Sequence, residues 1–124
     1  MYADVRLQHI GIVQLKQIRL SMNTPETFDF KFYEWEEKFR DKPFLKQPFG
    51  DEWEIYTWGE VGQYARKLAT GLRSLGLREN AHIGLISKNC REWIIADLAI
   101  VMAGYISVPF FPNLTSGEIN KLLT

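Results

Sequence analysis

One long apolar run constrains the fold of this chain more than any other feature. Residues 93–111 carry a single charge, Asp97, and have nearly the length of a membrane span, which needs about 20 apolar residues. Gly104 divides the run, however, and a lipid-exposed break would leave backbone groups without hydrogen-bond partners. A buried helix before Gly104 and a buried strand after it explain the run better. A small membrane-associated protein anchored by residues 93–111 is the less favoured alternative.

Three capping patterns mark where helices begin. Thr57 and Thr115 are each followed three residues later by glutamate, which is the capping box, and Asn89 stands three residues before Glu92 with asparagine as the cap. Runs that are rich in apolar residues at helical spacing follow these patterns. We therefore expect one helix over residues 58–75 with Gly76 at its end, a second over residues 90–103, and a third that begins near Ser116.

The segments between these helices predict strands at residues 82–87 and 105–111. The second segment is almost wholly apolar, which is typical of strands buried on both faces of a parallel sheet. Helices and strands alternate, so the expected fold class is α/β, with βαβ units and a mostly parallel sheet. Upstream, the pattern predicts a helix within residues 26–40 and a hairpin of residues 44–46 and 53–56 around Gly50.

Two predicted sheet strands are too few for an independent sheet, because covering both faces normally needs more strands beside them. We therefore interpret residues 26–124 as the incomplete N-terminal portion of a larger domain, and residues 1–25 stay unassigned. The first twenty residues contain no uninterrupted apolar region of the kind found in secretory signals.

Charge and cysteine content exclude several classes of function. Fifteen basic residues balance fifteen acidic ones, which gives no electrostatic footprint for nucleic acid. The single cysteine rules out an internal disulfide framework and a cysteine-based zinc cluster, and His9 and His82 have no partner at metal-ligand spacing. We expect a cytoplasmic protein, and peripheral contact with a membrane stays open.

Two stretches of the chain carry a family resemblance: Asn89-Cys90-Arg91-Glu92-Trp93 and Ala103-Gly104-Tyr105-Ile106-Ser107-Val108-Pro109. With them, residues 26–124 resemble the N-terminal region of the adenylate-forming (AMP-binding) enzymes, and the long-chain fatty acid–CoA ligases most closely. Where that family usually has Gly-Asp-Arg before a strand, this chain has Asn80-Ala81-His82. Asparagine tolerates the left-handed conformation that glycine would adopt, so we expect the turn to be kept.

The resemblance implies a large enzyme that uses ATP and Mg²⁺ to convert a fatty acid to an acyl-adenylate and then transfers the acyl group to coenzyme A. The mechanistic groups of that family lie in motifs downstream of this region, so we expect no catalytic, cofactor-binding or metal-binding residue in this chain. Its partner is then the remainder of the ligase chain, and fatty acid, ATP and CoA bind only in the full enzyme. A stand-alone truncated relative that acts as a binding or regulatory module is the alternative.

Four further features have a functional and a plainer interpretation, and we favour the plainer one for each. Thr115-Ser116-Gly117 is similar to a phosphate loop, but Glu118 follows it, and a helix cap explains the pattern. Cys90, at a helix start, is a candidate reactive thiol, or simply a small half-buried residue. The alternating charges of residues 31–40 indicate a solvated face. The aromatic residues of 28–39 indicate packing on the domain, rather than a patch that faces a membrane or a partner.

Overall fold

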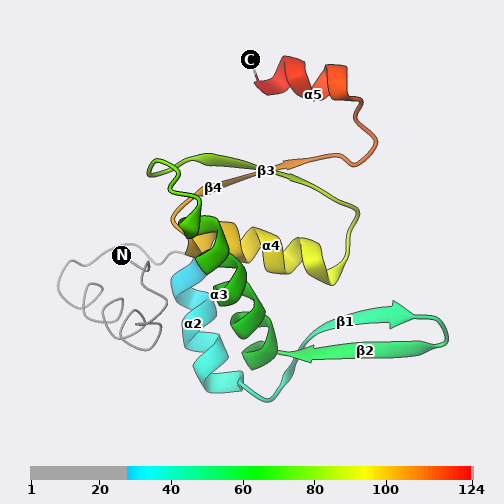
Figure 1. The fold of residues 1–124 in the computed structure, drawn as a ribbon. Coiled ribbons are helices and arrows are strands. Elements are labelled where there is room, and N and C mark those ends of the chain that lie inside the picture. The colour runs from blue at the N-terminus through cyan, green and yellow to red at the C-terminus, as the bar shows by residue number, and fades with distance from the viewer. Residues whose placement is uncertain (1–27, 124) are drawn as a thin grey trace.

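The computed structural model describes residues 28–123, with side chains from Phe30 onward. The expectations for residues 1–25, and for His9 among them, lie outside the described residues. Figure 1 shows the elements, which are in chain order α2 (Phe28–Phe39), β1 (Pro43–Phe49), β2 (Glu52–Thr57), α3 (Trp58–Ser74), β3 (His82–Ile86), α4 (Arg91–Met102), β4 (Ile106–Phe110) and α5 (Ser116–Leu123).

Helix α3 packs against both α2 and α4, because its apolar residues recur along one stripe. Val61 and Ala65 on this stripe are fully buried. Their small side chains let the neighbouring helices approach closely. The core continues into α2 through Phe32 and into α4 through Leu98 and Ala99, so it lies among the three helices.

Local signals set both ends of α3. Thr57 Oγ1 accepts a hydrogen bond from the amide of Glu60 at 3.2 Å, and Glu60 Oε2 accepts one from the amide of Thr57 at 2.8 Å, which completes the capping box. At the other end Gly76 has φ of +66°, the left-handed conformation in which many helices end. The predicted helix over residues 58–75 is confirmed to within one residue.

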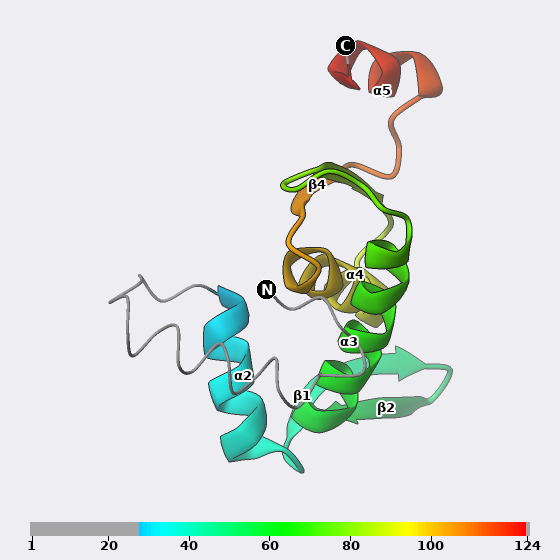
Figure 2. The same ribbon diagram turned by 60° about the vertical axis from the view of Figure 1, so that its left-hand side comes forward.

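Strands β3 and β4 pair in parallel, and α4 is the crossover between them, which confirms the α/β fold class. Ile83 and Leu85 of β3 pack against the core on the side of α4. Figures 1 and 2 both show α5 on the other side of this sheet. The expectation that β4 is buried on both faces is wrong within residues 28–123, because Ile86 and Ile106 on the face away from α4 are exposed.

Two further turns each contain a residue in the left-handed conformation. Gly104 ends α4 with φ of +82°, and its amide donates to Val101 O at 3.0 Å while the amide of Tyr105 donates to Ile100 O at 3.0 Å. This pair of bonds is the Schellman motif. Asn80 has φ of +56°, so asparagine does take the place of glycine in the turn before β3.

Strands β1 and β2 form the predicted hairpin, and both are longer than the sequence pattern indicated. The turn contains Gly50 with φ of +62°. At the base of the hairpin the ring of Phe44 stacks on that of Trp58 with centroids 4.0 Å apart. The turn end of the hairpin extends from this anchor away from α2 and α3 (Figure 1).

The long apolar run divides as expected into α4 and β4. No helix within residues 28–123 is long and apolar enough to cross a membrane. The aromatic residues of α2 mostly pack on the domain, since Phe30, Phe32 and Tyr33 are buried, whereas Trp35 is partly exposed beside Trp58. The packing interpretation of this segment is therefore confirmed for the residues that can be described.

Candidate functional site

A buried ion pair joins α2 to α3. Arg66 Nη1 and Nη2 donate to the two carboxylate oxygens of Glu36 at 2.6 and 2.7 Å, and Glu36 is 4% exposed. Gly62, one turn before Arg66, makes room for the pair, because a Cβ atom there would lie 2.2 Å from Glu36 Oε1. The expectation that the charges of residues 31–40 form a solvated face is therefore wrong for Glu36, whose partner lies 30 residues away.

A second cluster centres on Arg91, the first residue of α4. Arg91 Nη1 donates to Glu54 Oε2 at 2.6 Å, and the guanidinium lies 4.5 Å from the ring centre of Tyr56, whose hydroxyl donates to the same Glu54 oxygen at 2.8 Å. Arg91 Nε donates to Glu92. Hydrogen bonds to Glu92 and Glu54 raise the pKa of Arg91, and the hydrogen bond from Arg91 is the largest cause that lowers the pKa of Glu92.

The start of α4 differs from the prediction by one residue. Cys90, and not Asn89, is the N-cap, and it makes no side-chain cap hydrogen bond. The amide of Arg91 instead donates to Gln47 Oε1 of β1 at 2.7 Å. This acceptor lies 44 residues away, outside the reach of any local pattern, which explains why the sequence pointed to Asn89.

The Arg91 cluster borders a groove of about 380 Å³ between β2, α3 and α4. Leu68 and Ile95 supply apolar surface to it, and the Tyr56, Arg91 and Glu92 side chains that line it are hydrogen-bonded within the Arg91 cluster. The clustered charges therefore join the hairpin to α4. The complete lining is Tyr56, Tyr64, Leu68, Arg91, Glu92 and Ile95.

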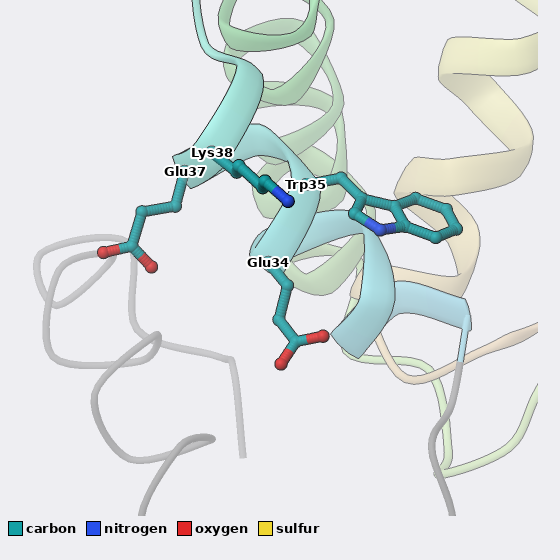
Figure 3. Close-up of a pocket in the computed structure, with 4 residues that line it drawn as sticks. All are labelled: Glu34, Trp35, Glu37 and Lys38. Atoms are coloured by element: carbon teal, nitrogen blue, oxygen red, sulfur yellow. The ribbon is translucent and has the colours of Figure 1, made fainter.

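Figure 3 shows a second hollow, of about 380 Å³, on the surface of α2. Glu34, Trp35, Glu37 and Lys38 line it, so all four of these residues come from one helix. The two carboxylates point away from each other in this view. Acid–base catalysis by paired carboxylates needs two groups that reach one substrate, and these two do not converge.

The structure shows the surroundings of the remaining candidate residues that the sequence suggested, which are Thr115 with Glu118, Cys90 and His82. Glu118 Oε2 accepts from the amide of Thr115 at 2.8 Å and Thr115 Oγ1 accepts from the amide of Glu118 at 3.3 Å, which confirms the helix cap. Cys90 is half-buried, with Sγ 3.6 Å from Ser87 Oγ. His82 lies at the opposite end of β3 from Cys90. Among residues 28–123 no group of three or more His, Cys, Asp or Glu side chains is placed to hold a metal ion.

Sequence reasoning missed the residues that bind across elements, chiefly Glu36, Arg66, Gln47 and Arg91. Most of them carry no local signal, because their partners lie 30 to 44 residues away. Gly62, which makes room for the Glu36–Arg66 pair, does carry a signal in the sequence. Glycine in a helix interior is unfavourable, so its presence between Val61 and the rest of the apolar stripe indicates that another group approaches closely there.

Comparisons with known proteins show what this chain is similar to. A family model for AMP-binding enzymes matches residues 32–124. The chain is 29% identical over 103 residues to the long-chain-fatty-acid–CoA ligase heimdall of Drosophila melanogaster, a match that covers 80% of this chain and 15% of the relative. It is 33% identical over 84 residues to 4-coumarate–CoA ligase 1 of Solanum tuberosum, covering 68% and 15%. The chain thus spans 15% of the length of each of these relatives.

Solved structures show the same fold. The N-terminal subdomain of Klebsiella oxytoca NpsA superposes with a TM-score of 0.70 at 22% identity, over 80% of this chain and 25% of that one. At this level of identity the likeness concerns the arrangement of helices and strands.

Proposed function

Because the chain belongs to the AMP-binding enzyme family, we propose that it is the N-terminal part of an ATP-dependent long-chain fatty acid–CoA ligase. The observation that carries the proposal is the match of the family model to residues 32–124, which takes in nearly all of the described fold. The similarity to the fatty-acid ligase of Drosophila melanogaster supports the choice of substrate.

The whole enzyme would use ATP and Mg²⁺ to form an acyl-adenylate and would then transfer the acyl group to CoA. At the one stretch that is similar to a phosphate loop, the described residues do not fit a phosphate group. The stretch most similar to a phosphate loop, at Thr115, is occupied by the carboxylate of Glu118, which accepts from both the amide and the hydroxyl of Thr115. A negative charge at this position repels phosphate. We therefore assign no catalytic step to residues 28–123.

The role of this chain in the ligase is architectural. Its two charge clusters, at Glu36 and at Arg91, bind partners from other elements of this chain, and its parallel strands form a sheet of two strands only. Residues 26–124 would form part of the large domain of the enzyme, with residues 1–25 as an unassigned N-terminal segment. This part of the enzyme supplies strands and covering helices on which catalytic motifs elsewhere are positioned.

Exchange of labelled pyrophosphate into ATP tests the proposal directly, because it reports formation of an acyl-adenylate. The full-length protein should catalyse exchange that depends on a long-chain fatty acid such as palmitate, and the 124-residue chain alone should not. Exchange catalysed by the 124-residue chain would contradict the architectural role.

The relative from Solanum tuberosum identifies the competing substrate class, since 4-coumarate is also a carboxylic acid that is joined to CoA. The assay is therefore run with palmitate and with 4-coumarate in parallel. Exchange that depends on 4-coumarate alone would keep the ligase and refute the fatty-acid substrate.

The mass of the endogenous protein tests whether this chain acts within a larger one. An antibody raised against residues 26–124 should detect a band several times heavier than 14.5 kDa. A band at 14.5 kDa would instead favour a stand-alone binding or regulatory module.

A further inference from the structure

One face of the β1–β2 hairpin binds a single residue of α4. Gln47 and Glu54 are cross-strand partners, so their side chains project from the same face of the hairpin. Both bind Arg91: Gln47 Oε1 accepts from the backbone amide at 2.7 Å, and Glu54 Oε2 accepts from Nη1 at 2.6 Å. Tyr56, two residues beyond Glu54 on this face, covers the guanidinium with its ring at 4.5 Å.

The hairpin beyond this contact is exposed. Phe49 and Trp53 near its turn are 69% and 64% exposed, and Ile55 is also exposed. The base, in contrast, is anchored in the core through the stacking of Phe44 on Trp58. A two-stranded hairpin is marginally stable by itself in water, so the outer half depends on whatever holds its middle. In this structure the middle is held at Arg91.

Arg91 also lies directly after the loop that joins β3 to α4. It follows Cys90 directly, and the loop before Cys90 leaves the carboxyl end of β3. Open parallel sheets bind their ligands at the carboxyl ends of strands. A change at Arg91 therefore reaches both the hairpin and the loop between β3 and α4.

We propose that residues 46–55 form a strap that Arg91 holds closed over the N-terminus of α4, and that the strap opens as a unit while the core of helices stays folded. Opening removes the Gln47 acceptor from the first amide of α4, so the β3–α4 loop, with Cys90, loosens together with the strap. This goes beyond the proposed function and does not rest on it, because a stand-alone chain would carry the same strap.

The strap opens easily because its main charged contact is partly solvated. The side chains of Arg91 and Glu54 are 29% and 40% exposed. Ion pairs with this degree of exposure are weak, and salt screens them. Raised ionic strength should therefore act in the same direction as removal of the ion pair.

Hydrogen exchange and alkylation of Cys90 test the strap and its coupling together. Arg91→Gln removes the guanidinium that binds Glu54 and contacts Tyr56, and Glu54→Gln removes only the charge on the hairpin side. Arg78→Gln, in the exposed turn before β3, is the matched control with the same change of charge. All variants are measured by peptide-resolved exchange and by the iodoacetamide labelling rate of the peptide that contains Cys90.

We expect Arg91→Gln to raise exchange within residues 46–55 about tenfold, and to raise the labelling rate of Cys90, with exchange in α3 unchanged. Glu54→Gln and an increase from 50 to 500 mM NaCl should shift both readouts in the same direction by smaller factors. Arg78→Gln should change neither. Unchanged exchange in residues 46–55 would overturn the strap. An equal rise in α3 would show global unfolding instead, and a loosened hairpin with an unchanged labelling rate of Cys90 would overturn the coupling.

Discussion

Replacing Arg66 with methionine is expected to destabilise the packing of α2 on α3 by about 3 kcal/mol. Methionine keeps much of the apolar stem but removes hydrogen bonds of 2.6 and 2.7 Å, and it leaves the Glu36 carboxylate without a counter-charge. Loss of one partner from a buried ion pair costs about 3–5 kcal/mol. The lower end applies here, because the side chains are 5% exposed at Glu36 and 15% exposed at Arg66, so some water reaches the site.

The double variant Glu36→Leu/Arg66→Met separates loss of the pair from burial of an unpaired charge. It should recover to within about 1 kcal/mol of the original stability, since the cost of desolvating two charges nearly offsets their attraction. Urea unfolding, followed by tryptophan fluorescence, measures both variants, since Trp35 of α2 contacts Trp58 of α3. Lys67→Met, at an exposed position of α3, is the control and should change stability by less than about 0.5 kcal/mol. The reasoning is refuted if the double variant is no more stable than Arg66→Met.

Three further predictions concern single positions. Gly62→Ala should destabilise the protein by about 1–3 kcal/mol in urea unfolding, because the new methyl group would lie 2.2 Å from Glu36 Oε1, and in a Glu36→Ala background this penalty should largely disappear. Hydrogen bonds from the amide and then the hydroxyl of Thr115 lower the pKa of Glu118 from its ordinary value of 4.5. The Glu118 carboxylate is therefore charged in the cap at pH values above 4.5, and the cap is lost as the pH falls through the lowered pKa. NMR titration of the α5 amides should show this loss, and Glu118→Gln should abolish the titration. Gly104→Ala should lower stability by about 1–2 kcal/mol in thermal unfolding, since φ of +82° strains any residue with a Cβ atom, and an unchanged Tm would contradict this reasoning.

Local chemistry made much of the fold predictable. A threonine three residues before a glutamate contains both members of a capping box, so Thr57 and Thr115 predicted the starts of α3 and α5 correctly. Gly104 likewise predicted the end of α4, because the left-handed turn needs only the residue that adopts it. The alternation of helices with strands, together with the apolar character of β4, predicted the parallel pairing of β3 and β4.

Long-range chemistry was not predictable in the same way. The sequence places Glu36 among alternating charges that look solvated, and only the folded arrangement of α2 on α3 shows that Arg66 removes it from water. The cap of α4 was assigned to Asn89 because no local pattern reports a glutamine on another element. Burial of β4 was overestimated, since composition does not say which face of a strand is covered.

The hydrogen bond between Gln47 and the first amide of α4 has a consequence for the order of events during synthesis. The acceptor precedes the residue that it caps by 44 positions, so it leaves the ribosome first. At about 5–20 residues per second, this gives Gln47 a lead of about 2–9 seconds. Hairpins form within about 1–10 μs, which is far shorter than that interval. The Gln47 acceptor is therefore synthesised and free to sample the hairpin before α4 exists, and the hairpin is held in place only once Arg91 follows.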